Sequence, residues 1–166
     1  LYKDTIIYAG LGVSSIRKYN IKDSLPILNF GLAYVEYGPA SHLTFNEDSS
    51  KVVYVSEYNG ETIIAFNTIT GAYQYSVGIT MNPTNGSGSG TVFHMKRLGS
   101  KVYVVGYIEA VQQGYNYIAR RGFFSFDGST GVLSPDDLHA DGYPTFLDFH
   151  NGKIYLSGNF NTVNSV

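Results

Sequence analysis

The sequence has no cysteine, few charges and no long hydrophobic run. The absence of cysteine excludes disulfides and thiol chemistry. Charged residues make up 14% of the 166 residues and the net charge is −2, whereas about 25% is usual. The basic residues are scattered, so the electrostatic footprint of a nucleic-acid-binding protein is missing. No apolar run approaches the ~20 residues of a transmembrane helix. We therefore expect neither a nucleic-acid partner nor a membrane span in this segment.

Tyrosine and glycine are abundant instead, with 15 and 19 residues. This composition suits many short strands joined by glycine turns. Segments with helical periodicity do not exceed about ten residues, so we expect helix to be nearly absent. The length suffices for one domain with a real core. A surface rich in Ser, Thr, Tyr and Asn favours an extracellular or cell-surface location.

The stretch 51–73 shows the pattern that organises the chain. An apolar run, Val52–Val55, is followed by Asn59-Gly60, a strong signal for a two-residue hairpin turn. The return strand is Thr62–Phe66, and Asn67–Gly71 closes it with a glycine turn. Such a hairpin cannot bury both faces by itself, so it needs neighbouring copies.

The chain supplies these copies. Strands with a central tyrosine recur at Tyr8, Tyr54, Tyr103 and Tyr155, with spacings of 46, 49 and 52 residues. Short alternating segments precede the last three, and further strands follow. A period of about 40–50 residues with four short antiparallel strands is typical of a β-propeller blade. The predicted fold class is therefore all-β, a propeller or partial propeller of four-stranded antiparallel blades.

The repeat divides the single domain 1–166 into approximate units. These are 1–36 and 142–166, both partial, and the complete units 37–89 and 90–141. About three and a half blades leave an open arc, whereas propellers usually close with four to eight. We expect a segment of a longer propeller, with a small four-bladed ring as the alternative. Four residues should lie on strands buried between blades: Tyr54, Val55, Val104 and Ile154.

Two segments resemble known propeller repeats. Residues 53–71 resemble the YVTN-type repeat, a Tyr-Val strand, an Asn-rich turn and a strand ending in an Asn-x-x-Thr-Gly turn. Residues 154–163 resemble a Tyr-x-Gly-Gly-x-Phe-x-x-Val repeat of secreted and cell-surface propellers. Residues 20–24 lack the final glycine, and 109–117 form an insertion. The resemblance implies a propeller module of microbial, surface-layer-like surface proteins, and it specifies fold better than function.

The densest polar cluster is a candidate metal site. Three carboxylates and one imidazole within six residues could ligate a metal or perform acid–base chemistry; they belong to Asp136, Asp137, His139 and Asp141. The alternative is a solvated loop. A second segment, 127–131, has too few oxygen ligands for Ca²⁺ and is interpreted as a turn in which Asp127 caps the backbone.

Three further features are candidate sites. The histidines His42, His94, His139 and His150 occupy different positions in their units when tyrosines are aligned, so we expect no ring of ligands across blades. Asn85 begins an N-glycosylation sequon. The pair Arg120-Arg121, near Tyr115 and Tyr117, could contact a glycan or an acidic partner, or be a solvated strand edge.

The sequence contains no nucleophile elbow, paired-glutamate spacing or other local catalytic constellation. We therefore favour a non-catalytic extracellular propeller module for protein–protein interaction, adhesion, or surface or filament assembly. Its partners would be proteins, further copies of itself or a glycan, and no cofactor is expected. The alternative hypothesis is a fragment of a propeller enzyme (a lyase, hydrolase or quinoprotein-like oxidoreductase) with a loop site at 136–141.

Overall fold

The protein is all-β, and its strands pair antiparallel. The computed structural model describes residues 5–9, 16–20, 23, 40–56, 62–135 and 138–165, and no helix occurs among them. Its strands are β1 (Thr5–Ala9), β2 (Ile16–Asn20), β3 (Ala40–Phe45), β4 (Lys51–Ser56), β5 (Thr62–Asn67), β6 (Tyr73–Thr80), β7 (Thr91–Leu98), β8 (Lys101–Tyr107), β9 (Ala110–Gln113), β10 (Asn116–Ala119), β11 (Phe123–Asp127), β12 (Leu138–Ala140), β13 (Tyr143–His150), β14 (Lys153–Asn159) and β15 (Val163–Ser165). The expected scarcity of helix is confirmed for this part of the chain.

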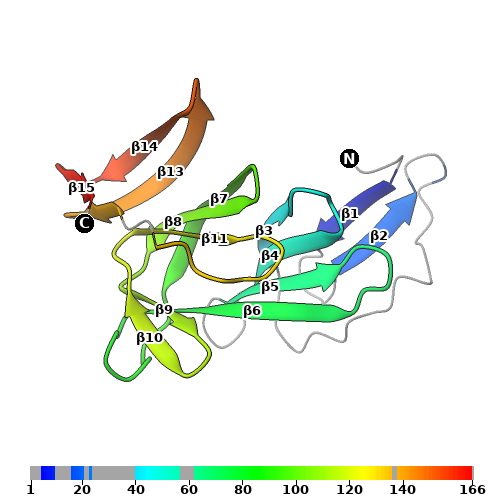
Figure 1. Cartoon of the computed structure of the whole chain (residues 1–166), viewed down its shortest axis with the longest axis horizontal. Helices are drawn as coiled ribbons and strands as arrows, with labels where there is room; N and C mark the ends of the chain where they lie inside the picture. The colour runs from blue at the N-terminus through cyan, green and yellow to red at the C-terminus, as the bar shows by residue number, and fades with distance from the viewer. Residues whose placement is uncertain are drawn as a thin grey trace.

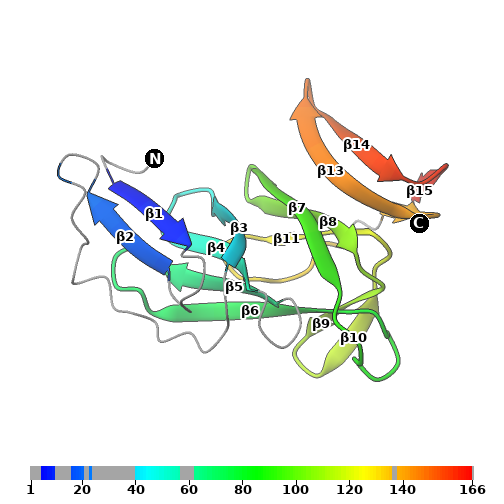
Figure 2. The same cartoon turned by 180° about the vertical axis from the view of Figure 1, so that it is seen from behind.

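The described residues form five sheets, and four of them follow one another along the long axis of the molecule (Figures 1 and 2). We call them sheet 1 (β1–β2), sheet 2 (β3–β6), sheet 3 (β7, β8 and β11) and sheet 4 (β13–β14). Within each sheet, consecutive strands pair as antiparallel neighbours. The sheets remain open, and they do not close into a barrel or ring over the described residues.

The core lies between successive sheets. We call the face of a sheet that points to the next sheet its forward face, and the opposite face its backward face. Val53, Val55 and Ile63 on the forward face of sheet 2 share one buried cluster with Val104 and Phe124 on the backward face of sheet 3. Fully burying each such side chain contributes about 1.5–3 kcal/mol. Face-to-face packing of sheets is thus the main source of stability.

The same arrangement recurs between sheets 3 and 4. Val105 and Phe123 lie on the forward face of sheet 3 and pack against Leu147 of sheet 4. Of the residues expected to be buried, Tyr54, Val55 and Val104 are buried. Ile154 is only half-buried, because sheet 4 contributes two paired strands where sheet 2 contributes four.

In the observed strand register, Lys51 and Lys101 occupy equivalent positions, whereas Tyr54 and Tyr103 do not. Lys51 pairs with Asn67 and Lys101 with Asp127, each at the turn that closes the hairpin. Tyr54 therefore falls on the backward face of its sheet, where it is 2% exposed and stacks on Phe66. Tyr103 falls on the forward face and packs against Phe149 of sheet 4, with ring centroids 4.9 Å apart. Alignment on the tyrosines is thus wrong by one residue here.

The predicted insertion 109–117 is part of a β-hairpin. β9 pairs with β10, and β9 also pairs with β6, so the hairpin extends sheet 2 although it follows β8 in the chain. Residues 163–165 behave similarly, since β15 follows β14 and pairs with β12. In both cases, the segment that follows the second strand of a sheet pairs with a strand that precedes that sheet in the chain, β6 or β12. These pairings link neighbouring units.

Two expectations fall partly outside the described residues. The Asn59-Gly60 turn is not among them, although the strands that flank it pair as a hairpin, with Ser56 opposite Thr62. Of the segment 20–24, which lacks the final glycine of the repeat, only residues 20 and 23 are described. Within the described ranges, no helix has the length and apolarity that crossing a bilayer requires.

Candidate functional site

The first strands of sheets 2, 3 and 4 are neighbours in space and carry the same irregularity. β3 contacts β7, and β7 contacts β13. The pairing with the second strand shifts between Ala40 and Leu43 in β3, between Val92 and His94 in β7, and between Pro144 and Phe146 in β13. These positions are 52 residues apart. A β-bulge bends the strand and re-aims the next side chain, and bulges are frequent beside functional sites.

The residues that follow these bulges form one row across the three strands. We call His42, His94 and Phe146 the aromatic row. The rings of His42 and His94 are arranged edge to face with centroids 6.4 Å apart. The ring of His94 stacks on Phe146 with centroids 4.4 Å apart and an angle of 28°. The repeated bulge therefore brings together three side chains whose residues span 104 positions of the sequence, from His42 to Phe146.

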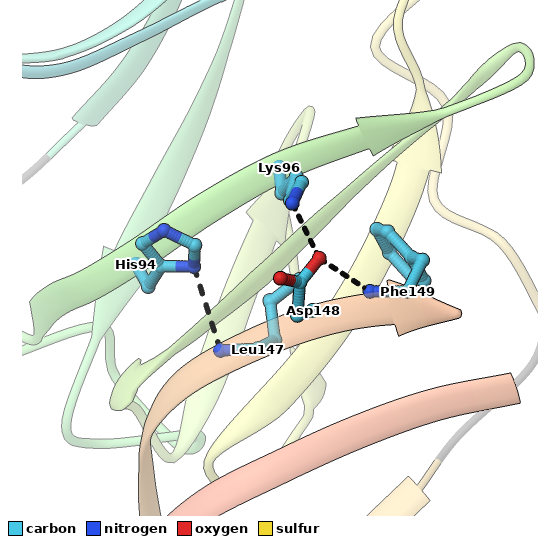
Figure 3. Close-up of polar contacts among 5 residues, drawn as sticks. All are labelled: His94, Lys96, Leu147, Asp148 and Phe149. Atoms are coloured by element: carbon cyan, nitrogen blue, oxygen red, sulfur yellow. Dashed lines mark hydrogen bonds and ion pairs between the residues drawn. The ribbon is translucent and has the colours of Figure 1, made fainter.

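A second row lies two residues further along the same strands. We call Thr44, Lys96 and Asp148 the polar row; side chains two apart in a strand share a face. Lys96 Nζ donates to Asp148 Oδ1 and forms an ion pair between sheets 3 and 4 (Figure 3). The side chains of Lys96 and Asp148 are 43% and 48% exposed. The pair is therefore within reach of a ligand from solvent, and it contributes little to stability by itself.

His94 is held as a neutral acceptor. The Leu147 N–H of sheet 4 donates to His94 Nδ1 over 3.4 Å (Figure 3). Nδ1 must then be unprotonated, which places the proton of the neutral ring on Nε2. Partial burial lowers the pKa of His94, and the neighbouring His42 and Lys96 lower it further, while Asp148 and the backbone hydrogen bond with Leu147 oppose them. At neutral pH the aromatic row is thus uncharged at His94.

Asp148 stays ionised. The hydrogen bond from Lys96 and then the one from the Phe149 N–H, 2.6 Å from Asp148 Oδ1, lower the pKa of this carboxyl. The two rows therefore combine aromatic rings and hydrogen-bond donors with one ammonium and one carboxylate whose charges cancel.

The prediction that the histidines would occupy unrelated positions is wrong for two of them. His42 and His94 each directly precede a paired core residue, Leu43 on β3 and Met95 on β7; His94 follows its register shift, whereas His42 lies within the shifted segment. Phe146 takes the third position, so the row is not a ring of metal ligands. A constant separation of 52 residues between His42, His94 and Phe146 was the sequence signal; alignment on tyrosine concealed it.

The structure describes two of the four residues of the predicted metal cluster. Asp136 and Asp137 lie outside the described residues. His139 belongs to β12, opposite Asn164 of β15. Asp141 Oδ1 accepts hydrogen bonds from the N–H groups of Asn161 at 2.7 Å and Thr162 at 3.1 Å, and these bonds lower its pKa. No group of three potential ligands that could hold a metal occurs among the described residues; the metal site stays a prediction.

The turn interpretation of residues 127–131 is confirmed. Asp127 Oδ1 accepts from the N–H groups of Ser129 and Thr130, both at 2.9 Å. Asn67 Oδ1 does the same with Ile69 and Thr70 in the equivalent turn of sheet 2, also at 2.9 Å. Both turns end on a glycine with positive φ, Gly71 and Gly131. The carboxylate of Asp127 is thus used by the backbone.

Three other candidate residues from the sequence, Asn85, Arg121 and Tyr115, do not belong to the two rows. Asn85 is exposed in a turn, where its Oδ1 accepts from the Ser87 N–H at 3.0 Å. Arg121 pairs with Glu109 at 3.4 Å and lies 5.7 Å from the ring centre of Tyr143. Tyr115 is fully exposed at the tip of the β9–β10 hairpin. Burial and a 2.5 Å hydrogen bond to Glu109 raise the pKa of Tyr143 to about 12.

Comparison with known structures finds a similar fold. The crystal structure of the computationally designed Ika4 protein matches with a TM-score of 0.63 at 14% sequence identity, over 100% of this chain and 86% of the designed chain. At this identity the likeness concerns the fold alone. Comparisons of the sequence with protein-family models and with curated proteins found no match. The YVTN-type resemblance therefore stays a prediction.

Proposed function

We propose that this chain is a non-catalytic β-propeller module of the cell exterior that works by assembly, with its four sheets as blades. Three observations support the proposal. The sheets pack face to face, the units repeat with a separation of 52 residues in the second half, and the surface is weakly charged. The YVTN-type resemblance adds an expected setting in microbial surface proteins. The exposed sequon at Asn85 fits this setting.

The observation that carries the proposal is the contrast between Tyr103 and Tyr155. Tyr103 lies opposite Lys96 on the forward face of sheet 3, and Tyr155 lies opposite Asp148 at the equivalent position of sheet 4. Sheet 4 covers Tyr103, which packs on Phe149. Tyr155 is 51% exposed, and Phe146 on the same face is 47% exposed. An aromatic sheet face of this kind is typical of an interaction surface.

The occupant that this face fits is another blade, which a second copy of the chain supplies unless further residues of a longer protein do. The forward faces of sheets 2 and 3 are both covered by a backward face made of Val, Leu, Ile and Phe side chains. The backward faces of sheets 2, 3 and 4 are buried within the chain, so a second copy would present the backward face of its sheet 1. Head-to-tail stacking of copies would therefore continue the packing geometry that already joins sheets 3 and 4, and would form a ring or a filament depending on closure.

Analytical ultracentrifugation of the purified chain over a range of concentrations tests this proposal. We expect concentration-dependent association of the native chain. Tyr155→Ser should weaken association at least tenfold, because it removes the aromatic side chain from the centre of the face. The matched control is Tyr115→Ser, a change at a fully exposed tyrosine on the hairpin tip, which should leave association unchanged.

Two outcomes would overturn the assembly proposal. One is a native chain that stays monomeric at all concentrations; the other is equal association of the native chain and Tyr155→Ser. Circular dichroism of each variant shows whether it retains the β fold, so that loss of association is not confused with unfolding.

A further inference from the structure

We propose that the aromatic and polar rows together bind a neutral saccharide. This inference goes beyond the assembly function, because the rows lie on the first strands and need no second copy. They form a grid of three strands by two positions, with His42 and Thr44 on β3, His94 and Lys96 on β7, and Phe146 and Asp148 on β13. The bulges that precede all three strand segments aim the grid.

A residue of the grid stays accessible when the next sheet packs against the strand that carries this residue. His94 is already stacked by Phe146 of the next sheet and still is only half-buried. His42, on the strand before it, is also half-buried. Stacking a further blade on sheet 4 would therefore cover Tyr155 and leave the positions of the two rows partly open.

A metal ion does not suit the grid. The Leu147 N–H donates to His94 Nδ1, so the neutral ring carries its proton on Nε2, the nitrogen left for a ligand. Binding a metal through Nε2 would move the proton to Nδ1, where it would face another donor. Among the described residues, moreover, no three histidine or acidic side chains gather as a metal would require. His42 and His94 therefore offer hydrogen-bond donors and acceptors.

Charge and polarity exclude two other ligand classes. Lys96 and Asp148 neutralise each other through their ion pair, so an anion gains no net attraction at neutral pH. An apolar ligand would have to remove this ion pair from water without replacing its hydrogen bonds, which is costly. The remaining class has an apolar face and many hydroxyl groups.

A neutral sugar ring meets both requirements. The exposed part of the Phe146 ring offers a flat apolar surface to the C–H face of a pyranose. Two residues along β13, Asp148 can accept from one hydroxyl while Lys96 donates to its neighbour, and hydrogen bonds to charged groups are about twice as strong as neutral ones. A hydrogen-bond donor and an acceptor side by side, next to an aromatic ring, suit two adjacent hydroxyl groups of a sugar.

Isothermal titration and saturation-transfer NMR test the proposal with neutral trisaccharides of glucose, galactose, mannose or N-acetylglucosamine. We expect saturable binding of at least one of them by the native chain. Phe146→Leu keeps an apolar side chain against His94 but loses the flat ring, and should weaken binding at least tenfold. Asp148→Asn keeps the shape but loses the charge and should do the same. Tyr115→Ala removes an exposed tyrosine elsewhere and should change nothing.

Absence of saturable binding by the native chain to every trisaccharide would overturn the proposal. So would undiminished binding by folded Phe146→Leu and Asp148→Asn. Tight binding of Zn²⁺ that His94→Phe abolishes would overturn it in favour of a metal site. Tyr155→Ser separates this proposal from the assembly proposal, since it should weaken association and leave trisaccharide binding within twofold.

Discussion

Among single residues, His94 links the candidate site to the packing of the sheets. Its ring stacks on Phe146 and its Nδ1 accepts the Leu147 N–H, so both contacts reach sheet 4. The acceptor role requires the neutral ring. Protonation would place a proton against the Leu147 N–H and a positive charge beside Lys96. The contact between sheets 3 and 4 should therefore depend on pH.

The pKa of His94 is lowered in the folded protein, chiefly by burial and then by His42 and Lys96, with Asp148 and the backbone hydrogen bond with Leu147 opposing. The unfolded chain consequently binds a proton more readily, near the ordinary pKa of about 6.5. The stabilisation is complete above that pH and is lost as the pH falls below it. We expect the urea midpoint to fall between pH 7.5 and pH 5, and to fall less in His94→Phe.

The control for the pH experiment is His150→Asn, since His150 is exposed at the end of β13. This variant should keep the pH dependence of the native chain. An identical fall of the urea midpoint in the native chain and in His94→Phe would contradict the role given to His94. Asp148 does not confuse the result, because its hydrogen bonds from Lys96 and the Phe149 N–H lower its pKa, away from the pH range of the experiment.

At the scale of the strand, close backbone approach at the bulges constrains the second strands. A Cβ added to Gly106 of β8 would lie 1.9 Å from the carbonyl oxygen of Thr91 in β7. At Gly158, the equivalent position in β14, it would lie 2.6 Å from backbone atoms of β13. Backbone atoms cannot move aside as a flexible side chain can. Glycine is therefore required at Gly106 and Gly158, whereas Ser56 takes the equivalent position opposite Ala40 in sheet 2.

We predict that Gly106→Ala destabilises the protein by about 2–3 kcal/mol, the usual cost of overpacking, measured by urea unfolding. Gly78→Ala is the matched control. Gly78 also lies in a strand, but its added Cβ would meet side-chain atoms of Gln112, Oε1 at 2.9 Å and Cβ at 3.1 Å, and no backbone atom, so the cost should be smaller than at Gly106. Equal destabilisation by both substitutions would show that the backbone contact is not the cause.

The sequence predicts the strands well where apolar residues and turns alternate. β4 and β5 lie within a residue or two of their predicted positions. The β9–β10 hairpin was missed because Gln112, Gln113 and Asn116 give it a polar appearance typical of a loop. Gly114, with positive φ at the hairpin turn, was its local signal. Its pairing with β6 depends on residues 30 positions away, which no local pattern encodes.

At the scale of the whole molecule, the sheets differ in how fully they are covered. Sheet 2 is packed on both faces, since its backward face holds the buried cluster of Val52, Tyr54, Ile64 and Phe66. Sheet 4 is packed on its backward face only and exposes Tyr155. Local stability follows buried contacts and strand pairing. Opening free energy should therefore fall from sheet 2 to sheet 4.

Hydrogen exchange measured by mass spectrometry tests this gradient. β8 and β14 are both second strands, but β8 pairs with β7 and β11 whereas β14 pairs with β13 alone. We expect the amides of β14 to exchange at least tenfold faster than those of β8 in dilute solution. At concentrations that favour association, exchange in β14 should slow and exchange in β10 should not. Equal exchange of β8 and β14 in dilute solution would contradict the gradient.

The order of units along the chain could be predicted from the sequence, but the candidate site could not. Repeating strands and turns are local features, and they indicate antiparallel sheets. The aromatic row depends on three bulges, and a bulge adds one residue without any marked change in composition: Phe93 and Thr145 stand at two of them. The constant separation of 52 residues between His42, His94 and Phe146 is visible in the sequence, but only the paired register gives it a structural meaning.

The bulges also separate residues that hold the protein together from residues that it displays. On each first strand the core position, Leu43, Met95 or Leu147, alternates with a displayed position, His42, His94 or Phe146. Histidine already exchanges with phenylalanine at the displayed position without any change in backbone register. Mutations at the displayed position would alter the proposed saccharide site, and at His94 they would also remove contacts with sheet 4. The repeated bulge therefore places side chains that differ between units at equivalent positions of similar strands.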